Sequence, residues 1–242
     1  RHIHDVVTNV EGLPIETEKK VNFFTRQYID ALSPSNFALT NPEVFRETVK
    51  SHGQNLLKGF NNLLRDIEEG DGQLRVKMTD PTAFELGHNV AVTPGKVVFQ
   101  NDLIQLLQFS PTTQEQYRRP LLIMPPWINK YYILDLRQSN SFIKWATDQG
   151  HTVFVSSWVN PDQRLAEKGA QQIGEFAPVA AVDAVCKQTG EDEVNLIGYC
   201  LGGTLLGATL GYNAVKKDKR IVSATFFVAL LDFSIPGELG VF

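Results

Sequence analysis

The stretch VNLIGYCLGGTLLG, Val194 to Gly207, decides the fold of this chain, because an apolar run meets a glycine-rich turn and then becomes apolar again. Cys200 lies in that turn, and Gly198 and Gly202 flank it with G-x-C-x-G spacing. Glycines at these two places leave room for a strand and a helix to close around a sharp turn. The pattern therefore predicts a strand, a turn that carries Cys200, and a helix that begins near Leu201.

A cysteine at such a turn is placed as a nucleophile would be. The turn after a strand of an open parallel sheet lies at the carboxyl edge, where these sheets bind their ligands. A helix that begins at Leu201 would direct its peptide dipoles toward the sulfur and favour the thiolate. Two other interpretations stay open. One is a phosphate-binding turn, although Gly198, Gly202 and Gly203 do not fit G-x-G-x-x-G, and the other is a buried structural cysteine beside packing glycines.

Short runs rich in valine, isoleucine and phenylalanine recur from Lys96 onward, and the later runs are separated by segments long enough for helices. Strands that alternate with helices indicate a parallel sheet covered on both faces. Cys186, in the second expected helix, is interpreted as a small buried apolar residue. The expected strands are KVVFQ, PLLIMPP, HTVFVSSW, EVNLIGYC and SATFFVALLDF, and the expected helices are SNSFIKWATDQG and EFAPVAAVDAVCKQTG.

The first third of the chain has a different pattern. ETEKKVNFFTRQYIDAL and NPEVFRETVKSHGQNLLKGFNNLLRDIEEG repeat apolar residues at helical spacing, with proline breaks between them. We expect a helical amino-terminal region over residues 1–95 and an α/β domain over residues 96–242. The apolar helix faces are interpreted as packing surfaces rather than as ligand sites.

Composition narrows the possible functions. A content of 43% hydrophobic residues in 242 supports a sizeable core, and the net charge of -4 gives no basic surface for nucleic acid. The two cysteines have no zinc-ligand spacing, so no metal site is expected, and a reduced, cytoplasmic protein is favoured. Neither a bilayer-spanning run nor a signal peptide is recognisable. Because the chain begins at Arg1, we expect a fragment or a processed protein.

Four long motifs give the chain a family resemblance. LLIMPPWINKYYILDL, GHTVFVSSWVNPD, GYCLGGT and LLDFSIPGELGVF occur in this order, after an upstream FFTRQYIDALSPSNFALTNPEV. Together they resemble the polyhydroxyalkanoate synthases, cytoplasmic members of the α/β-hydrolase fold with a cysteine nucleophile in a lipase-like box. Within that family the likeness is to the class that needs no second synthase subunit and favours short-chain hydroxyacyl groups. It covers the family's amino-terminal portion to just past the nucleophile turn.

The resemblance implies a reaction and a set of residues. Cys200 matches the nucleophile that takes the acyl group from (R)-3-hydroxyacyl-CoA and transfers it to a growing polyester. The CoA thioester is the substrate, and no cofactor is implied. The backbone N–H of Leu201 would donate to the oxyanion, and the second donor would be Trp127 or Ile128, between which the sequence does not decide. Gly198, Gly202 and Gly203 shape the turn. The family also implies a homodimer at the surface of polyester granules, whereas the CoA-binding residues are unknown.

The chain also departs from the family pattern. The family's aspartate and histidine follow later in the sequence, so residues 1–242 are expected to lack full activity alone. His151 begins a strand and would lie at the wrong edge of the sheet for a general base, and Asp232 is interpreted as structural. Two alternatives stay open: a cysteine hydrolase similar to dienelactone hydrolase, and a truncated, non-catalytic protein that binds granules or a full-length synthase.

Overall fold

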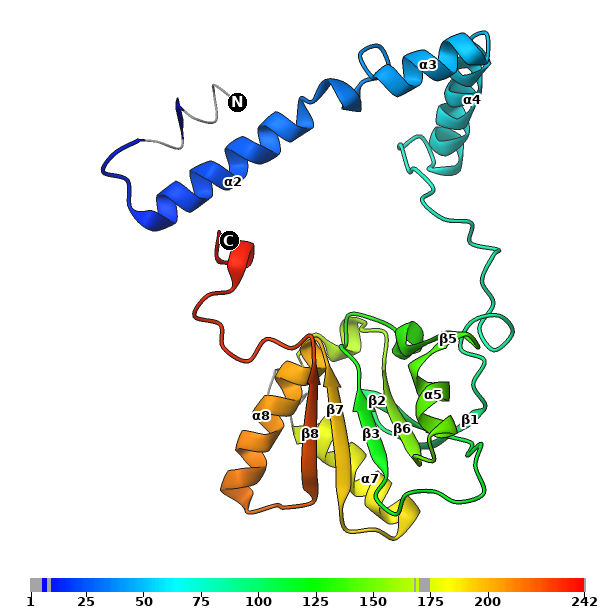
Figure 1. Ribbon diagram of the computed structural model, residues 1–242, viewed down its shortest axis with the longest axis vertical. Helices are drawn as coiled ribbons and strands as arrows, with labels where there is room; N and C mark the ends of the chain where they lie inside the picture. Colours follow the sequence, from blue (N-terminus) through cyan, green and yellow to red (C-terminus); the bar gives the residue numbers. More distant parts are fainter. Residues whose placement is uncertain (1–5, 8–9, 168, 170–174, 242) are drawn as a thin grey trace. The chain divides into compact units, whose positions relative to one another are not determined.

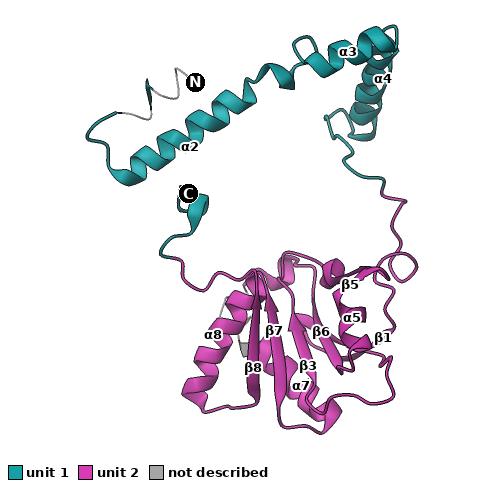
Figure 2. Ribbon diagram, viewed as in Figure 1, with its two compact units in different colours: residues 1–80, 234–242 teal, residues 81–233 magenta. Residues whose placement is uncertain are grey.

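The computed structural model describes residues 6–7, 10–167, 169 and 175–241. The chain forms two compact units, residues 1–80 with 234–242 and residues 81–233 (Figure 2). The expected helical region also includes residues 1–5 and 8–9, which lie outside the described residues. Residues 81–95 cluster with the sheet, and the domain division at residue 95 stays a prediction.

Unit 1 is helical where the amino-terminal pattern predicts helices. Asn41 caps one helix by accepting hydrogen bonds from the N–H groups of Glu43 and Val44 at 2.8 and 3.4 Å. The long pattern that follows is interrupted at Gly53, whose φ of 83° ends one helix and starts the next. None of the residues in the three α-helices Ile15–Ala31, Pro42–Lys50 and Gln54–Glu69 is buried. The elements are α2 (Ile15–Ala31), η1 (Pro34–Asn36), α3 (Pro42–Lys50), α4 (Gln54–Glu69) and η5 (Gly237–Val241).

Unit 2 contains a six-stranded sheet in the order β1-β2-β6-β3-β7-β8 (Figure 1). The last four strands of this order run parallel, and β1 and β2 add an antiparallel edge next to β6. A separate pair, β4 and β5, forms a small antiparallel ladder. The strands are β1 (Gly95–Gln100), β2 (Ile104–Phe109), β3 (Leu121–Met124), β4 (Asp135–Arg137), β5 (Asn140–Ser141), β6 (Val153–Trp158), β7 (Val194–Tyr199) and β8 (Ile221–Phe227).

Helices cover both faces of this sheet. On one face, Leu122 and Leu196 pack with residues of α7 and α8, and on the other, Ile123 and Val155 pack with residues of α5. These two apolar clusters form the core of unit 2 and fix the neighbouring strand ends relative to each other. The remaining elements are η2 (Tyr131–Leu134), α5 (Phe142–Asp148), η3 (Gln163–Leu165), η4 (Glu175–Val179), α7 (Ala180–Thr189) and α8 (Leu201–Lys216).

The expected α/β-hydrolase fold, with a mostly parallel sheet preceded by a helical region, is confirmed. Several details differ from these expectations, and the short strands β4 and β5 were not predicted. β2 does not read as a continuous apolar run, because the exposed Gln105 separates the buried Ile104 and Leu106, and it was therefore not predicted. β8 ends at Phe227, so the following VALLDF is not strand. The expected second helix begins as a π-helical turn around Pro178, which has no N–H to donate.

Candidate active site

Cys200 lies between the end of β7 and the start of α8, the strand, turn and helix that the sequence predicts. Its backbone has φ 54° and ψ -123°, a conformation that residues with a side chain rarely adopt. Hydrogen bonds hold it there. The N–H of Cys200 donates to the carbonyl of Phe227 at 2.8 Å, and its carbonyl accepts from the N–H groups of Gly203 and Thr204 at 2.9 and 3.2 Å. The turn is therefore built into the sheet rather than loosely attached to it.

Each of the three glycines around Cys200 lies against another backbone or side chain. A Cβ atom on Gly198 would lie 2.5 Å from Cα of Gly203. One on Gly202 would overlap the carbonyl oxygen of Met124, and one on Gly203 would overlap Cβ of Ala229. No side chain fits at any of these positions unless the backbone moves, because Cβ contacts under about 3 Å do not occur. The glycines therefore let α8 approach the ends of β3 and β7 closely.

The two cysteines differ in their surroundings. Both are free thiols and both are partly buried. Cys186 packs against the apolar cluster beneath α7, and this burial raises the pKa of its thiol, with Arg220 opposing the effect. Cys200 instead lies at the carboxyl edge of the parallel strands, at the amino end of α8. The structure thus separates a packed thiol from a thiol at the carboxyl edge of the sheet, the edge at which open α/β sheets generally bind ligands.

The two expected sources of oxyanion donors lie next to each other. β3 and β7 are parallel neighbours, and Met124 pairs in register with Gly198, so the loop after β3 starts beside the Cys200 turn. Pro125 and Pro126 have no N–H, which makes Trp127 the first possible donor after the strand. The N–H groups of Leu201, Trp127 and Ile128 make no hydrogen bond to another described residue. All three expected donors are available, and the choice between Trp127 and Ile128 stays open.

The loop after β3 is attached to the end of β6. The indole Nε1–H of Trp158 donates to the carbonyl of Pro125 at 2.8 Å. The rings of Trp127 and Trp158 meet edge to face at 5.9 Å between centroids. The ammonium of Lys130 contacts the amide oxygen of Asn160. These contacts join residues far apart in the chain, so no local pattern predicts them. The available sequence signal was the place of Trp158 and Asn160 at the carboxyl end of a strand, where functional loops gather.

A buried carboxylate fixes the far end of the same loop. Asp135, fully buried at the start of β4, accepts hydrogen bonds from the hydroxyl and the N–H of Thr93 at 2.6 and 3.2 Å. Just before it, burial raises the pKa of the Tyr131 hydroxyl, with the charge of Asp135 as a further cause. The rings of Tyr131 and Tyr132 pack edge to face. Both ends of the loop are therefore anchored to the rest of unit 2.

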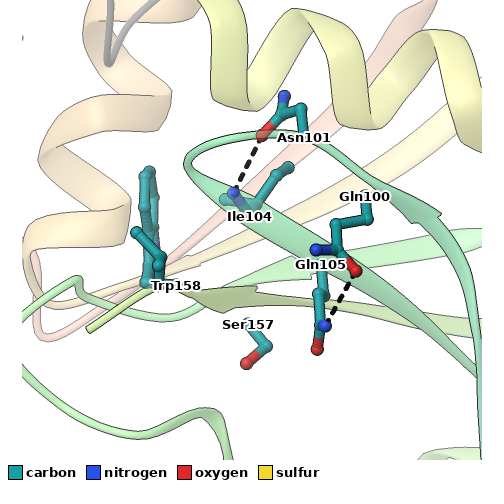
Figure 3. Close-up of a pocket in the computed structure, with 7 residues that line it drawn as sticks. Gln100, Asn101, Ile104, Gln105, Ser157 and Trp158 are labelled. Carbon is teal, nitrogen blue, oxygen red and sulfur yellow. Dashed lines mark hydrogen bonds between the residues drawn. The ribbon is translucent and has the colours of Figure 1, made fainter. Parts of the chain in front are cut away.

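A cavity of about 180 Å³ lies between the carboxyl end of β6 and the turn that joins β1 to β2. Trp158 and Ser157 project from opposite sides of β6, and the side chains of Gln100 and Gln105 are hydrogen bonded to each other at 3.0 Å (Figure 3). The cavity is lined by Gln100, Asn101, Ile104, Gln105, Ser157, Trp158 and Val159. Cys200 and the expected oxyanion donors are not among these residues, and Trp158 is the residue of this lining that also contacts the loop after β3.

The two candidates for a base and an acid within this chain lie elsewhere. His151 precedes the amino end of β6, at the sheet edge opposite to Cys200, and its ring contacts that of Tyr117 in a tilted arrangement with 5.0 Å between centroids. Its Nδ1 atom is buried and has no hydrogen-bond partner among the described residues. Asp232 lies in the exposed loop after β8. No group of three or more potential metal ligands occurs in the described part of the chain, and no described helix is long and apolar enough to cross a membrane.

Comparisons with known proteins relate the chain to one family. A family model described as the N-terminus of poly-beta-hydroxybutyrate polymerase (PhaC) matches residues 1–146. The poly(3-hydroxyalkanoate) polymerase subunit PhaC of Rhizobium meliloti is 52% identical over 237 residues, covering 98% of this chain and 39% of that protein. The poly(3-hydroxyalkanoate) polymerase of Methylorubrum extorquens is 49% identical over 242 residues, covering 100% of this chain and 40% of that protein. The chain spans about two fifths of the length of these relatives.

Among solved structures, a probable hydrolytic enzyme from Pseudomonas aeruginosa is similar to this chain with a TM-score of 0.41 and 14% sequence identity, covering 57% of this chain and 42% of that one.

Proposed function

The chain belongs to the poly-beta-hydroxybutyrate polymerase (PhaC) family, and from this premise we propose that it carries the nucleophile of an acyltransferase. The enzyme would join (R)-3-hydroxyacyl groups from CoA thioesters into polyhydroxyalkanoate and release CoA. The observation that carries the proposal is the strained backbone of Cys200 at the carboxyl edge of the sheet, between β7 and α8. Backbone strain of this kind persists where the surrounding structure holds it, and it clusters at active sites.

In the proposed reaction, the Cys200 sulfur attacks the carbonyl carbon of the CoA thioester. A bond forms between this carbon and the cysteine sulfur, the bond to the CoA sulfur breaks, and CoA leaves as a thiol with the proton that Cys200 gives up. The hydroxyl of the growing chain then attacks the enzyme thioester, forms an ester bond and returns a proton to the cysteine. Because one thioester replaces another, the acyl group remains activated for the second step.

Both steps pass through an oxyanion, which needs aligned donors. We propose the N–H of Leu201 as one donor and the N–H of Trp127 or Ile128 as the other. Each donor of this kind typically lowers the barrier by about 2.7 to 4 kcal/mol. The family resemblance supports an aspartate and a histidine, from the later part of the complete enzyme's sequence, as the acid and base that serve Cys200. His151 is not proposed for that role, because it lies at the opposite sheet edge.

The resemblance also supports a cellular setting. We propose that the complete enzyme is a cytoplasmic homodimer at the surface of polyester granules, that it takes no cofactor, since the CoA thioester is its substrate, and that it has no nucleic-acid partner. The net charge of -4 agrees with the last point.

A product assay on the full-length protein that contains this chain tests the proposal. With (R)-3-hydroxybutyryl-CoA we expect free CoA and insoluble polyester to accumulate together, and the Cys200→Ala variant to lose both while its circular dichroism spectrum stays unchanged. Free hydroxy acid without polymer would instead indicate a cysteine hydrolase. Granule binding without any CoA release would indicate a non-catalytic protein. Unchanged turnover in Cys200→Ala would remove Cys200 as the nucleophile.

A further inference from the structure

The carbonyl group of Pro125 is fixed from two directions. On one side the indole N–H of Trp158 donates to it at 2.8 Å. On the other side lies the first turn of α8, so close that a Cβ atom on Gly202 would be 2.9 Å from the same oxygen. Gly202 follows directly after Leu201, which carries one proposed oxyanion donor, and Pro125 lies two residues before Trp127, a candidate for the other. The Pro125 carbonyl therefore connects the two halves of the proposed oxyanion site.

Trp158 is itself held rigidly. It is the last residue of β6, its backbone pairs with Ile104 of β2, and its side chain packs against the larger apolar cluster. β6 is also the parallel neighbour of β3, the strand that leads into the loop. A donor at the end of a strand keeps its position better than one on a loop would.

The contact continues along the loop. Beyond the hydrogen bond, the rings of Trp127 and Trp158 meet edge to face at 5.9 Å. Two residues further, Asn160 accepts from the ammonium of Lys130. The loop from Pro125 to Lys130 thus meets the segment Trp158–Asn160 at three successive points, whereas the side chain of Ile128 is 68% exposed.

We propose that Trp158, assisted by Asn160, is a positioning residue for the oxyanion loop. Its N–H orients the Pro125 carbonyl, and the stiff Pro125-Pro126 backbone transmits that orientation to the N–H groups of Trp127 and Ile128. This inference rests on the proposed function, since it assigns a role within the same acyl transfer. Trp158 does not touch the reacting atoms in this role. It keeps the second donor at the distance from the Cys200 turn that the oxyanion requires.

The test compares Trp158→Phe with the unaltered full-length enzyme in CoA release from (R)-3-hydroxybutyryl-CoA. Phenylalanine keeps an aromatic ring near Trp127 and removes the N–H donor together with part of the indole's volume. We expect kcat to fall roughly ten- to a hundredfold, because a small displacement of an oxyanion donor costs that much. KM and the rate at which iodoacetamide alkylates Cys200 should stay within about twofold, since neither depends on the oxyanion donors.

Trp145→Phe is the matched control, because Trp145 is half exposed on α5 and stacks on Phe142 away from the loop. It should leave kcat unchanged. A kcat of Trp158→Phe within twofold of the unaltered enzyme would overturn the proposal, and so would a parallel loss of kcat, substrate binding and Cys200 alkylation, which marks a purely structural role.

Asn160→Ala and Cys200→Ala complete the test, the first in case Trp158→Phe does not fold and the second to test the proposed function itself. If Trp158→Phe does not fold, Asn160→Ala replaces it, and we expect its kcat to fall severalfold with KM unchanged, whereas an unchanged kcat would overturn the proposal. Cys200→Ala is assayed alongside. If that variant keeps its turnover, the proposed function itself fails, and this result is distinct from an active Trp158→Phe beside an inactive Cys200→Ala.

Discussion

At the scale of single residues, Cys200 is held in an unfavourable backbone conformation by its neighbours. A non-glycine residue in a sparsely populated region of this kind costs of order 1–3 kcal/mol. Hydrogen bonds to Phe227, Gly203 and Thr204 offset that cost, and they come from β8 on one side and α8 on the other. The thiol is therefore presented by the packing of two elements, and any change that loosens either element affects it.

The two thiols should differ in reactivity. At pH 7 we expect iodoacetamide to alkylate Cys200 at least about tenfold faster than Cys186, because only a thiolate reacts and burial raises the pKa of the Cys186 thiol. A raised pKa lowers the thiolate fraction at every pH below it, so labelling of Cys186 should increase only at clearly alkaline pH. Peptide mass spectrometry of samples quenched over time measures both rates.

The Cys186→Ala variant serves as the control for this labelling. It should leave the alkylation rate of Cys200 unchanged. Equal rates for the two cysteines at pH 7, or faster labelling of Cys186, would contradict the placement of Cys200 at an accessible catalytic turn.

At the scale of elements, the close approach of α8 to β3 depends on Gly202. We expect Gly202→Ala to destabilise the protein by about 1–3 kcal/mol, since the new Cβ would overlap the Met124 carbonyl, which is backbone and cannot rotate away. Gly211→Ala, in the same helix with nothing within 4 Å of its would-be Cβ, should instead stabilise by roughly 0.5–1 kcal/mol. Shifts of the thermal unfolding midpoint in opposite directions would confirm this difference. A destabilised Gly211→Ala would mean that α8 tolerates no added methyl group at all.

The elements also show what sequence patterns can predict here. The β7 strand, the Cys200 turn and the α8 helix were predictable, because glycines that leave no room for a side chain and a continuous apolar strand are local signals. The antiparallel β2 was missed, since Ile104 and Leu106 are buried while Gln105 is exposed, a pattern that a search for continuous runs overlooks. The link from Trp158 to Pro125 joins residues 33 positions apart, and no local pattern indicates such a contact.

The candidate site was predictable to a similar extent. Cys200 and the loop after β3 follow from chain order and sheet geometry, because neighbouring parallel strands bring their carboxyl ends together. The identity of the second oxyanion donor could not be predicted, since Trp127 and Ile128 are adjacent and both N–H groups are available. That choice depends on the orientation of one peptide, which the side-chain pattern does not encode.

At the scale of the whole molecule, much apolar surface is exposed in both units. In unit 1, α2, α3 and α4 contain no buried residue, although their sequences repeat apolar side chains at helical spacing. Large exposed apolar side chains in these helices include Phe24, Tyr28, Phe45, Leu57 and Phe60. Patches of this kind in soluble proteins usually mark contacts with other surfaces. The net charge of -4 on 242 residues provides only modest repulsion against association.

In unit 2, the edge strand β8 also favours association between copies of the chain, through backbone groups as well as apolar side chains. Among the described residues it pairs only with β7, so the peptide groups along its other side are open to a further strand. Val222 and Phe226 on this strand are 41% and 37% exposed. An apolar edge strand with unpaired N–H and C=O groups is a template for pairing between copies. We therefore expect the 242-residue chain, expressed by itself, to self-associate through β8.

Light scattering after size exclusion tests this expectation over a range of concentrations. The unaltered chain should show a mass that rises with concentration above its 27.1 kDa, and Val222→Lys should reduce that rise, because a charged side chain on an edge strand opposes pairing. Val215→Lys is the matched control, since Val215 is 81% exposed on α8 and not on the strand. If both lysine variants reduce association equally, general apolar exposure is the cause and not the β8 edge. A chain that stays monomeric at every concentration would show that this edge is protected by its own local geometry.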